Sequence, residues 1–481
     1  MNREFLINIL FLVTINLLIK PLFIFGIDRN VQNLVGEKAY GVYFSLMSFT
    51  IMFQIINDLG IQIFNSREIS QNQQLLDKYF SNIIVLKTCL GLIYIVSIAL
   101  MAVIFQYDIS LFPLIFSLAI NQILFSLLGY LRSNVAGLGY YRTNSILTIL
   151  DKLMMILVCS ILLWVEPFRS NFNIEWFVHA QNLTLFVTCC IAFFTVYKKV
   201  KLFKIRFHKP FLLSILRGSL PYALAIFLMT IYTRTDVVML ERLLPDGDRQ
   251  AGIYASAYRL LDAVNMLGFL FAGLLLPMFS RILKSGESIS PLLRFSFQII
   301  MVAALTLAVG VWFHRTEIMH VLYHEATDFS GEVLGYLMFS FVAISGTYIY
   351  STLLGANGSV SKMNGVFIAA IFINILLNFI LIPSQKALGA ALSTLITQFF
   401  VLFGVILLAK KELLLRGDVA WISKLISFVV SAFLINFIIK SSNFTPNWVF
   451  QLSISMFLCL VAALALGFLN YKKVENLLKT N

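Results

Sequence analysis

The residues best placed to do chemistry in this chain are charged side chains inside long apolar stretches. A charge near mid-bilayer costs about 2.5–3.5 kcal/mol on insertion scales, so it usually faces protein or water and has a function. Arg234 and Asp236 lie two residues apart, so on a helix they face different directions and do not neutralise each other locally. Arg259 and Asp262, three apart, share a helix face and are expected to pair. The other main interior charges are Lys20, Asp58, Lys87, Asp151 and Lys152.

Bases outnumber acids among the interior charges. Ten Lys and Arg residues lie within or at the edges of the apolar stretches, against five Asp and Glu residues. Both Lys and Arg bind phosphate through charge-assisted hydrogen bonds, so a cavity that gathered these bases would suit an anionic substrate such as a pyrophosphate. The alternative is that several of them form structural ion pairs or snorkel toward the membrane surface.

The elements that must position these charges are transmembrane helices. The 481 residues are 59% hydrophobic and only 12% charged, against about 25% charged in soluble domains, which excludes a soluble multi-domain enzyme and a disordered chain. The apolar stretches are about 20 residues long, the length of a membrane-spanning helix. We therefore predict an all-α polytopic membrane protein with about fourteen spans. They are 5–27, 40–64, 80–105, 110–131, 144–164, 176–197, 218–244, 253–280, 292–314, 331–354, 363–383, 386–409, 420–440 and 447–470.

The net charge of +13 indicates how the chain is oriented. With alternating spans, one set of connecting segments carries 20 Lys and Arg residues and the other set carries six. Segments rich in Lys and Arg stay in the cytoplasm, so we predict that both termini are cytoplasmic.

A basic segment divides the chain. Residues 198–213 contain six of the cytoplasmic positive charges, interleaved with apolar residues. The two halves resemble weak copies of each other, because Gly41-x-Tyr43 opens the second span and Gly252-x-Tyr254 opens the eighth. Parallel repeats of this kind occur in transporters with a substrate site between the halves. The predicted divisions are an N-terminal lobe at 1–197, a linker at 198–217, a C-terminal lobe at 218–409, and two further spans with a tail at 410–481.

Catalytic motifs are the next feature of the sequence. The sequence contains no Gly-rich phosphate loop or nucleophile elbow, and no pair of carboxylates placed for general acid–base work. The five cysteines lie in predicted spans without zinc spacing. We therefore expect no enzymatic activity, no metal site and no cofactor beyond a coupling Na⁺ or H⁺.

The order and spacing of several short motifs are similar to those of a known family. These are Tyr40-Gly41-x-Tyr43, Arg67-Glu68-Ile69, Thr233-Arg234-Thr235-Asp236, Ala257-Tyr258-Arg259-Leu260, Pro277-x-x-Ser280-Arg281, Asn374-x-x-x-Asn378 and Leu388-Gly389-Ala390-Ala391. In this pattern, which covers nearly the whole chain, the protein resembles the polysaccharide-biosynthesis, O-antigen-type flippases of the multidrug/oligosaccharidyl-lipid/polysaccharide exporter superfamily.

The resemblance implies a fold, a location and an activity. It implies two pseudo-symmetric six-helix lobes plus two C-terminal helices in the bacterial inner membrane. It also implies translocation of undecaprenyl-diphosphate-linked oligosaccharides by alternating access, in a pathway shared with glycosyltransferases and a glycan polymerase. The expected diphosphate and sugar site comprises Lys20, Lys87, Lys152, Arg234 and Arg259. The expected ion-coupling carboxylates are Asp58, Asp151, Asp236 and Asp262.

Two other functions stay open from the sequence. A multidrug antiporter of the same superfamily would share the architecture, but a carrier of cations should favour carboxylates over bases in its cavity. A membrane glycan polymerase or ligase would need a substantial outside loop, whereas the longest predicted here is 315–330. A flippase for peptidoglycan precursors is less favoured, because its expected patterns are not found.

Overall fold

The computed structural model describes residues 14–200, 209–415, 419–442 and 446–468. The described residues are almost entirely helical and contain no strand, as predicted. By length and composition, 11 of their helices are able to cross a membrane. Helices suit this setting because every backbone polar group is satisfied inside the segment, without water.

The contacts divide the chain into two compact units, Met1–Gly252 and Ile253–Asn481. The division falls inside a helix, and the seventh predicted span belongs by its contacts to the first unit, with α2 (Arg29–Met52) as its main partner. The predicted linker at 198–217 stays a prediction; residues 201–208 of it lie outside the described part.

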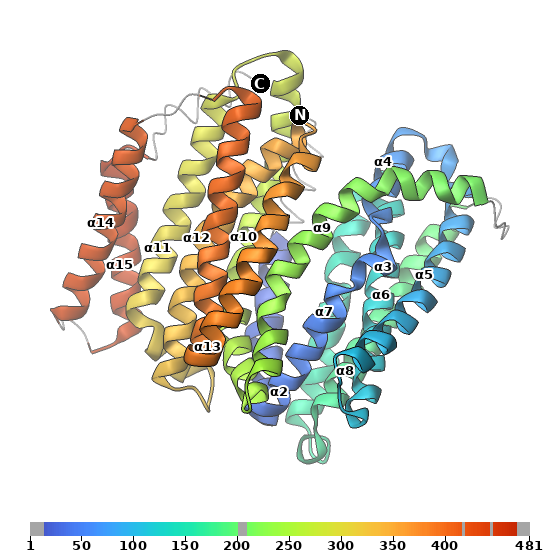
Figure 1. Ribbon diagram of the computed structural model, residues 1–481, viewed down its shortest axis with the longest axis horizontal. Helices are drawn as coiled ribbons and strands as arrows, with labels where there is room; N and C mark the ends of the chain where they lie inside the picture. Colours follow the sequence, from blue (N-terminus) through green and yellow to red (C-terminus); the bar gives the residue numbers. More distant parts are fainter. Residues whose placement is uncertain (1–13, 201–208, 416–418, 443–445, 469–481) are drawn as a thin grey trace. The chain divides into compact units, whose positions relative to one another are not determined.

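Figure 1 colours the first unit from blue to green. Residues 14–23 are helical and lead into the short π-helix η1 (Ile24–Asp28) and then α2. The remaining elements are α3 (Gln54–Asp58), α4 (Ile61–Gln71), η2 (Gln73–Leu75), α5 (Leu76–Ile104), η3 (Ile109–Leu111), α6 (Phe112–Gly137), α7 (Tyr141–Trp164), η4 (Arg169–Asn171), α8 (Ile174–Tyr197), α9 (Lys209–Leu243) and the start of α10 (Gly247–Ser285).

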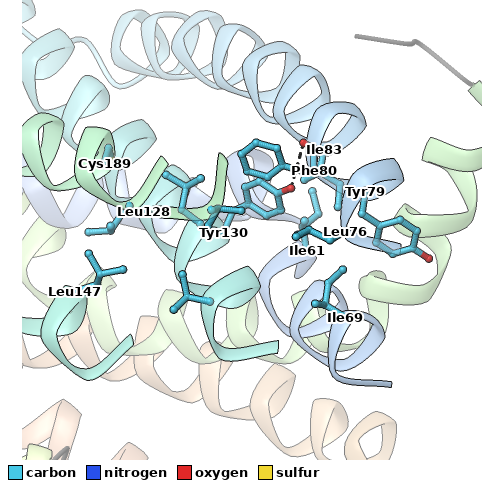
Figure 2. Close-up of a cluster of buried hydrophobic side chains, with 14 of the residues drawn as sticks. Ile61, Ile69, Leu76, Tyr79, Phe80, Ile83, Leu128, Tyr130, Leu147 and Cys189 are labelled. Atoms are coloured by element: carbon cyan, nitrogen blue, oxygen red, sulfur yellow. Dashed lines mark hydrogen bonds between the residues drawn. The ribbon is translucent and has the colours of Figure 1, made fainter. Parts of the chain in front are cut away.

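The core of the first unit lies between α4, α5, α6, α7 and α8 (Figure 2). Phe80 of α5 stacks near Tyr130 of α6, with ring centroids 6.4 Å apart, and both are fully buried. The Tyr130 hydroxyl donates a hydrogen bond to Phe80 O at 3.2 Å. In lipid, helices associate through close packing and such interhelical bonds, because the surrounding acyl chains are as apolar as the side chains.

The second predicted span is not one continuous helix. Its residues are divided among α2, α3 and α4, with breaks at Phe53 and at Leu59–Gly60. Leu59 and Gly60 both have left-handed backbone conformations, with φ of 48° and 73°. A side chain at Gly60 would meet Ser219 O of α9 at 2.6 Å, so glycine is required by both the dihedral angle and the close approach. The expectation of an unbroken span at 40–64 is therefore wrong.

Two glycines of the Gly-x-Tyr motifs allow α2 to approach the start of α10 closely. A methyl group at Gly41 would overlap Asp248 O, and one at Gly252 would overlap Glu37 O. Gln32 Nε2 donates to Gly252 O at 3.1 Å, and Arg249 pairs with Glu37 at 3.2 Å. Contact between small residues is a common way for membrane helices to approach.

We expect Gly252→Ala to disrupt this contact. The backbones of α2 and α10 must separate to accept the methyl group, and the Gln32 bond is then lost. Overpacking of this kind costs about 1–3 kcal/mol. Thermal unfolding of the purified protein should show a clear fall in Tm, whereas Gly273→Ala should not, because nothing lies within 4 Å of its added methyl group. Equal behaviour of the two variants would contradict the assignment.

The second unit, coloured from yellow-green to red in Figure 1, continues α10 and has five more helices among its described residues. They are α11 (Ser290–Leu322), α12 (Asp328–Ala356), α13 (Val360–Leu413), α14 (Val419–Ser441) and α15 (Trp448–Ala465). The predicted spans 363–383 and 386–409 both lie in α13, which contains a non-helical residue at Lys386 (φ 55°). The other predicted spans from the third onward each correspond to one helix.

A lysine supports a helix kink in this unit. His314 interrupts α11 with φ of −118°. Lys440 of α14 donates to Phe313 O next to the kink and pairs with Glu317 at 3.0 Å. The kink frees a carbonyl that the ammonium then satisfies, so Lys440 connects α14 to α11.

Candidate functional site

Three bases of the first unit lie within electrostatic range of one another near the first helical segment. Lys20, on the helix 14–23, interacts electrostatically with Lys152 and Asp151 of α7 and with Arg132 of α6. Lys152 pairs with Asp151 at 3.2 Å, and its Nζ lies 4.8 Å from the centroid of the Phe23 ring. We call Lys20, Arg132, Asp151 and Lys152 the Lys20 cluster.

The Lys20 cluster carries an excess of positive charge. It contains three bases and one carboxylate, and Asp151 already contacts Lys152. A further carboxylate of the same unit, Asp28, accepts a hydrogen bond from the Tyr40 hydroxyl at 2.8 Å. Even with Asp28 included, bases outnumber acids. The arrangement can therefore attract a polyanion, with the Arg guanidinium offering paired donors for phosphate oxygens.

Arg132 was not among the residues predicted to bind substrate. The sequence placed it in a cytoplasmic segment, because the fourth span was expected to end at residue 131. In the structure α6 continues to Gly137, and Arg132 Nε donates to Asn144 Oδ1 of α7 at 3.2 Å. The sequence did contain a signal that the helix extends past Arg132. The residues after Arg132 suit a helix as far as Gly137, and Gly139, where φ is positive, marks the turn that follows.

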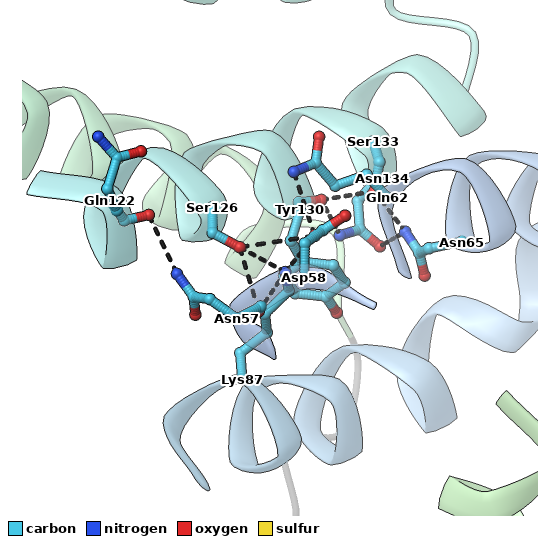
Figure 3. Close-up of polar contacts among 10 residues, drawn as sticks. All are labelled: Asn57, Asp58, Gln62, Asn65, Lys87, Gln122, Ser126, Tyr130, Ser133 and Asn134. Carbon is cyan, nitrogen blue, oxygen red and sulfur yellow. Dashed lines mark hydrogen bonds and ion pairs between the residues drawn. The ribbon is translucent and has the colours of Figure 1, made fainter. Parts of the chain in front are cut away.

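A second polar group lies at the break between α3 and α4 (Figure 3). Lys87 of α5 contacts Asp58 Oδ1 and donates to Ser126 Oγ at 2.6 Å and to Asn57 O at 3.2 Å. Its side chain is 4% exposed. The sequence-based hypothesis had Lys87 guiding a diphosphate and Asp58 exchanging an ion; the structure brings the two into one ion pair.

The end of α3 at this break has a backbone carbonyl group that the Lys87 ammonium can stabilise. A helix end leaves carbonyl groups without intrahelical partners and carries a partial negative charge. Asn57 O is such a group, at the end of α3, and both Lys87 and Ser126 donate to it. Gln62 Nε2 donates to the same Asp58 oxygen, Oδ1, at 3.2 Å. The network therefore satisfies a helix terminus inside the membrane region.

Further amides extend this network along α4 and α6, as Figure 3 shows. Asn57 Nδ2 donates to Gln122 O at 3.1 Å. Asn65 Nδ2 donates to Ser133 Oγ at 2.8 Å and to Asn134 Oδ1 at 3.1 Å. None of these residues was singled out from the sequence, although polar residues at helical spacing in an apolar stretch were the available signal.

A cavity of about 210 Å³ opens beside the break. Asp58, whose side chain is 18% exposed, is its one charged lining residue among the described residues. Polar groups come from Gln54, Gln62 and Thr230. The apolar lining residues are Ile51, Met52, Ile55, Leu59, Phe125, Ala223, Ile226 and Phe227.

The remaining predicted residues lie elsewhere. Arg234 and Asp236 are on α9 in the first unit; Arg234 is half-buried, and Asp236 is 1% exposed. Arg259 and Asp262 are on α10 in the second unit, 3.8 Å apart, as their spacing predicted. The structure thus brings together Lys20 with Lys152 and Asp151, and Lys87 with Asp58. The roles assigned to these residues in binding and coupling stay predictions.

Comparison with known proteins identifies the family. The family model described as "Polysaccharide biosynthesis protein" matches residues 5–283, more than half of the 481 residues. The chain belongs to the polysaccharide biosynthesis protein family. No curated protein sequence matches the chain.

Solved structures of transporters share the fold of this family member. The lipid II flippase MurJ, in an inward closed conformation, is similar with a TM-score of 0.67 and 14% identity, covering 97% of this chain and 99% of that one. A multidrug resistance MATE family transporter of the MOP superfamily, facing inward, has a TM-score of 0.60 and 14% identity, with 83% and 96% covered. A MOP superfamily transporter from Pyrococcus furiosus has a TM-score of 0.58 and 14% identity, with 84% and 95% covered.

These similarities define the architecture. The chain is a multi-pass membrane protein with the fold of MOP superfamily transporters, as the sequence motifs implied. At 14% identity the likeness concerns the fold alone.

Proposed function

We propose that this protein is a flippase that carries undecaprenyl-diphosphate-linked oligosaccharide repeat units across the bacterial inner membrane. It works by alternating access, with both termini in the cytoplasm and with coupling to H⁺ or Na⁺. Its role is transport and not catalysis, and its neighbours in the pathway are the glycosyltransferases and the glycan polymerase that make and consume the lipid-linked unit.

The observation that carries this proposal is the positive charge of the Lys20 cluster. Three bases from the helix 14–23, α6 and α7 face one carboxylate within it, inside the membrane-spanning part of the first unit. Isolated cations in that setting are costly, and an anionic headgroup offsets the cost. Lys20 and Arg132 bind the diphosphate oxygens, and Lys152, held near Asp151, adds to the field.

The same charge disfavours the multidrug antiporter. A cationic drug would be repelled by the net charge of the Lys20 cluster, whereas a diphosphate is attracted.

The short connection between α11 and α12 disfavours a membrane glycan polymerase or ligase. The outside loop expected at 315–330 is reduced to residues 323–327, because α11 ends at Leu322 and α12 begins at Asp328. Five residues are too few to hold a donor and an acceptor glycan.

Deletion of the gene in its own host tests the function. We expect the lipid-linked oligosaccharide to accumulate on the cytoplasmic leaflet and the surface glycan to be lost. The wild-type gene should restore display, whereas Arg234→Ala, which removes a half-buried charge of α9, should reach the membrane but fail to restore it. Arg281→Ala, at an exposed position of α10, is the control that should complement. Normal glycan display after deletion, or drug sensitivity as the sole phenotype, would refute the proposed function.

A further inference from the structure

We propose that the cavity beside the break between α3 and α4 holds one sugar ring of the transported oligosaccharide. In this subsite Gln54, Asp58 and Gln62 hydrogen-bond the hydroxyl groups of the ring and so decide which sugars the protein accepts. The inference rests on the proposed function. It adds a site for the glycan that is distinct from the Lys20 cluster, where the diphosphate is expected.

Hydrogen-bonding capacity that the described residues leave unused is concentrated at this cavity. Asp58 accepts its three hydrogen bonds at Oδ1, and no described residue donates to its Oδ2. The Gln62 amide makes one of these bonds through Nε2, and its carbonyl oxygen has no donor in the described part of the chain. The Gln54 amide makes no hydrogen bond to any described residue. All three side chains line the cavity and are half-buried, so a ligand there can reach them.

Gln62 is positioned by the close approach of α4 to α6. A methyl group on Gly129 of α6 would overlap the Gln62 amide, so the amide fits because this residue is glycine. Gln62 Nε2 donates to Asp58 Oδ1 at 3.2 Å, which holds the amide beside the carboxylate. Polar groups that are in place before a ligand arrives lose little conformational entropy on binding.

The unused groups favour a neutral ligand that carries hydroxyl groups. Asp58 Oδ2 and the Gln62 carbonyl oxygen accept hydrogen bonds, whereas the Gln54 amide both donates and accepts, and a hydroxyl group can do both. An ionised diphosphate offers acceptors only and would face the Asp58 carboxylate, so it is disfavoured here. An ammonium ion gains little, because Lys87 already neutralises Asp58.

The size and the apolar lining of the cavity fit a single ring. Its volume is about 210 Å³, whereas an apolar cavity of about 150 Å³ holds one benzene molecule. The additional volume accommodates the hydroxyl groups of a six-membered sugar ring, but not a chain of several sugars. Phe125 of α6 and Phe227 of α9 are among the lining residues. Such apolar side chains pack against the C–H face of a sugar, while a few polar groups fix its orientation.

The cavity lies at a suitable distance from the Lys20 cluster along α6. Phe125 lines the cavity, and Arg132 belongs to the Lys20 cluster. The two residues are seven positions apart, so they share one face of α6 and lie about 10.5 Å apart along its axis. In the substrate the glycan is attached directly to the diphosphate. A sugar close to this attachment can therefore occupy the cavity while the diphosphate is at the Lys20 cluster.

Binding of the free glycan tests the subsite directly. Mild acid releases the oligosaccharide from its lipid diphosphate, and ligand-observed NMR measures its affinity for the purified protein in a detergent without sugar headgroups. Gln54→Leu removes the amide at nearly constant size and should weaken binding about tenfold, as for the loss of one or two neutral hydrogen bonds. Gln73→Leu, at an exposed position of η2, is the matched control and should bind the glycan as the wild type does.

A second variant tests the cavity without changing its polar groups. Ile226→Trp enlarges a lining residue that is 46% exposed, so the new side chain has room to fold and fills the cavity. It should abolish detectable binding of the free glycan. Equal affinities of the wild type, Gln54→Leu and Ile226→Trp would overturn the proposal, as would a wild type that does not bind the free glycan.

Undecaprenyl diphosphate without sugar separates the possible failures. Its binding should be unchanged in Gln54→Leu and weakened in Lys20→Gln. If the wild type binds the free glycan through Gln54 but does not bind undecaprenyl diphosphate, the proposed function is wrong while the sugar subsite stands. If it binds undecaprenyl diphosphate and exports the lipid-linked glycan, but both cavity variants bind the free glycan normally, the function stands and the subsite is wrong.

Discussion

The Lys20→Gln, Arg132→Gln double variant should lose at least about a hundredfold in glycan export while reaching the membrane in normal amounts. Both side chains belong to the Lys20 cluster, in which bases from three helical segments act electrostatically with Asp151. A hydrogen bond to a charged group contributes about 1.5–3 kcal/mol. Two of them contribute about 3–6 kcal/mol, and each 1.4 kcal/mol corresponds to a factor of ten in affinity.

The measurement is the rate at which lipid-linked oligosaccharide reaches the outer leaflet, together with diphosphate binding to the purified variant. Lys198→Gln is the matched control, because Lys198 is exposed after α8 and makes no part of the cluster. Its export should stay within about twofold of wild type, as expected for a surface charge. Export by the double variant at the rate of this control would show that the Lys20 cluster does not hold the substrate.

Lys87→Met should destabilise the protein by about 3–5 kcal/mol, the usual cost of leaving a buried partner charge uncompensated. Asp58 would lose its cation, and Asn57 O would lose one donor at the end of α3. Thermal unfolding in detergent should show a large fall in Tm. Addition of Asp58→Asn should restore most of the loss, because the pair is then removed as a whole.

Lys152→Met provides the comparison for this stability effect. Lys152 also pairs with an aspartate, but Asp151 has Arg132 as a second charged neighbour, so its carboxylate is not left without a cation. Its stability change should stay below about 1 kcal/mol. If Lys87→Met and the double variant are equally unstable, packing of the lysine stem, and not charge, is the cause.

Lys87 and Lys440 stabilise irregular points of neighbouring helices in the same way. Each lies on a different helix from the irregularity it stabilises, and each contacts a carbonyl at a break or kink together with a nearby carboxylate. Two of the ten bases that the sequence counted as interior are therefore committed to structural contacts. Neither of these lysines belongs to the Lys20 cluster. That cluster still has more bases than acids, because Arg132 adds a third base to Lys20 and Lys152.

The helical type of the spans and the order of those from the third onward could be predicted from the sequence. The spans from the third onward were all found as helices, with two of them joined in α13. Each span is a local property, because about 20 apolar residues are enough to cross the hydrocarbon, whichever neighbours they acquire. The family was also predictable, because it depends on motifs that are read along the chain.

Only the tertiary structure decided which charges meet. Asp58 and Lys87 are 29 residues apart, and Arg132 and Lys20 lie on separate helical segments; no periodicity relates such pairs. The break at Leu59–Gly60 was equally hidden, because the left-handed backbone is stabilised by α9 packing on Gly60 and by Lys87 on Asn57 O. Insertion into lipid is set by the composition of each segment alone, whereas partners for polar groups are set by how the segments pack.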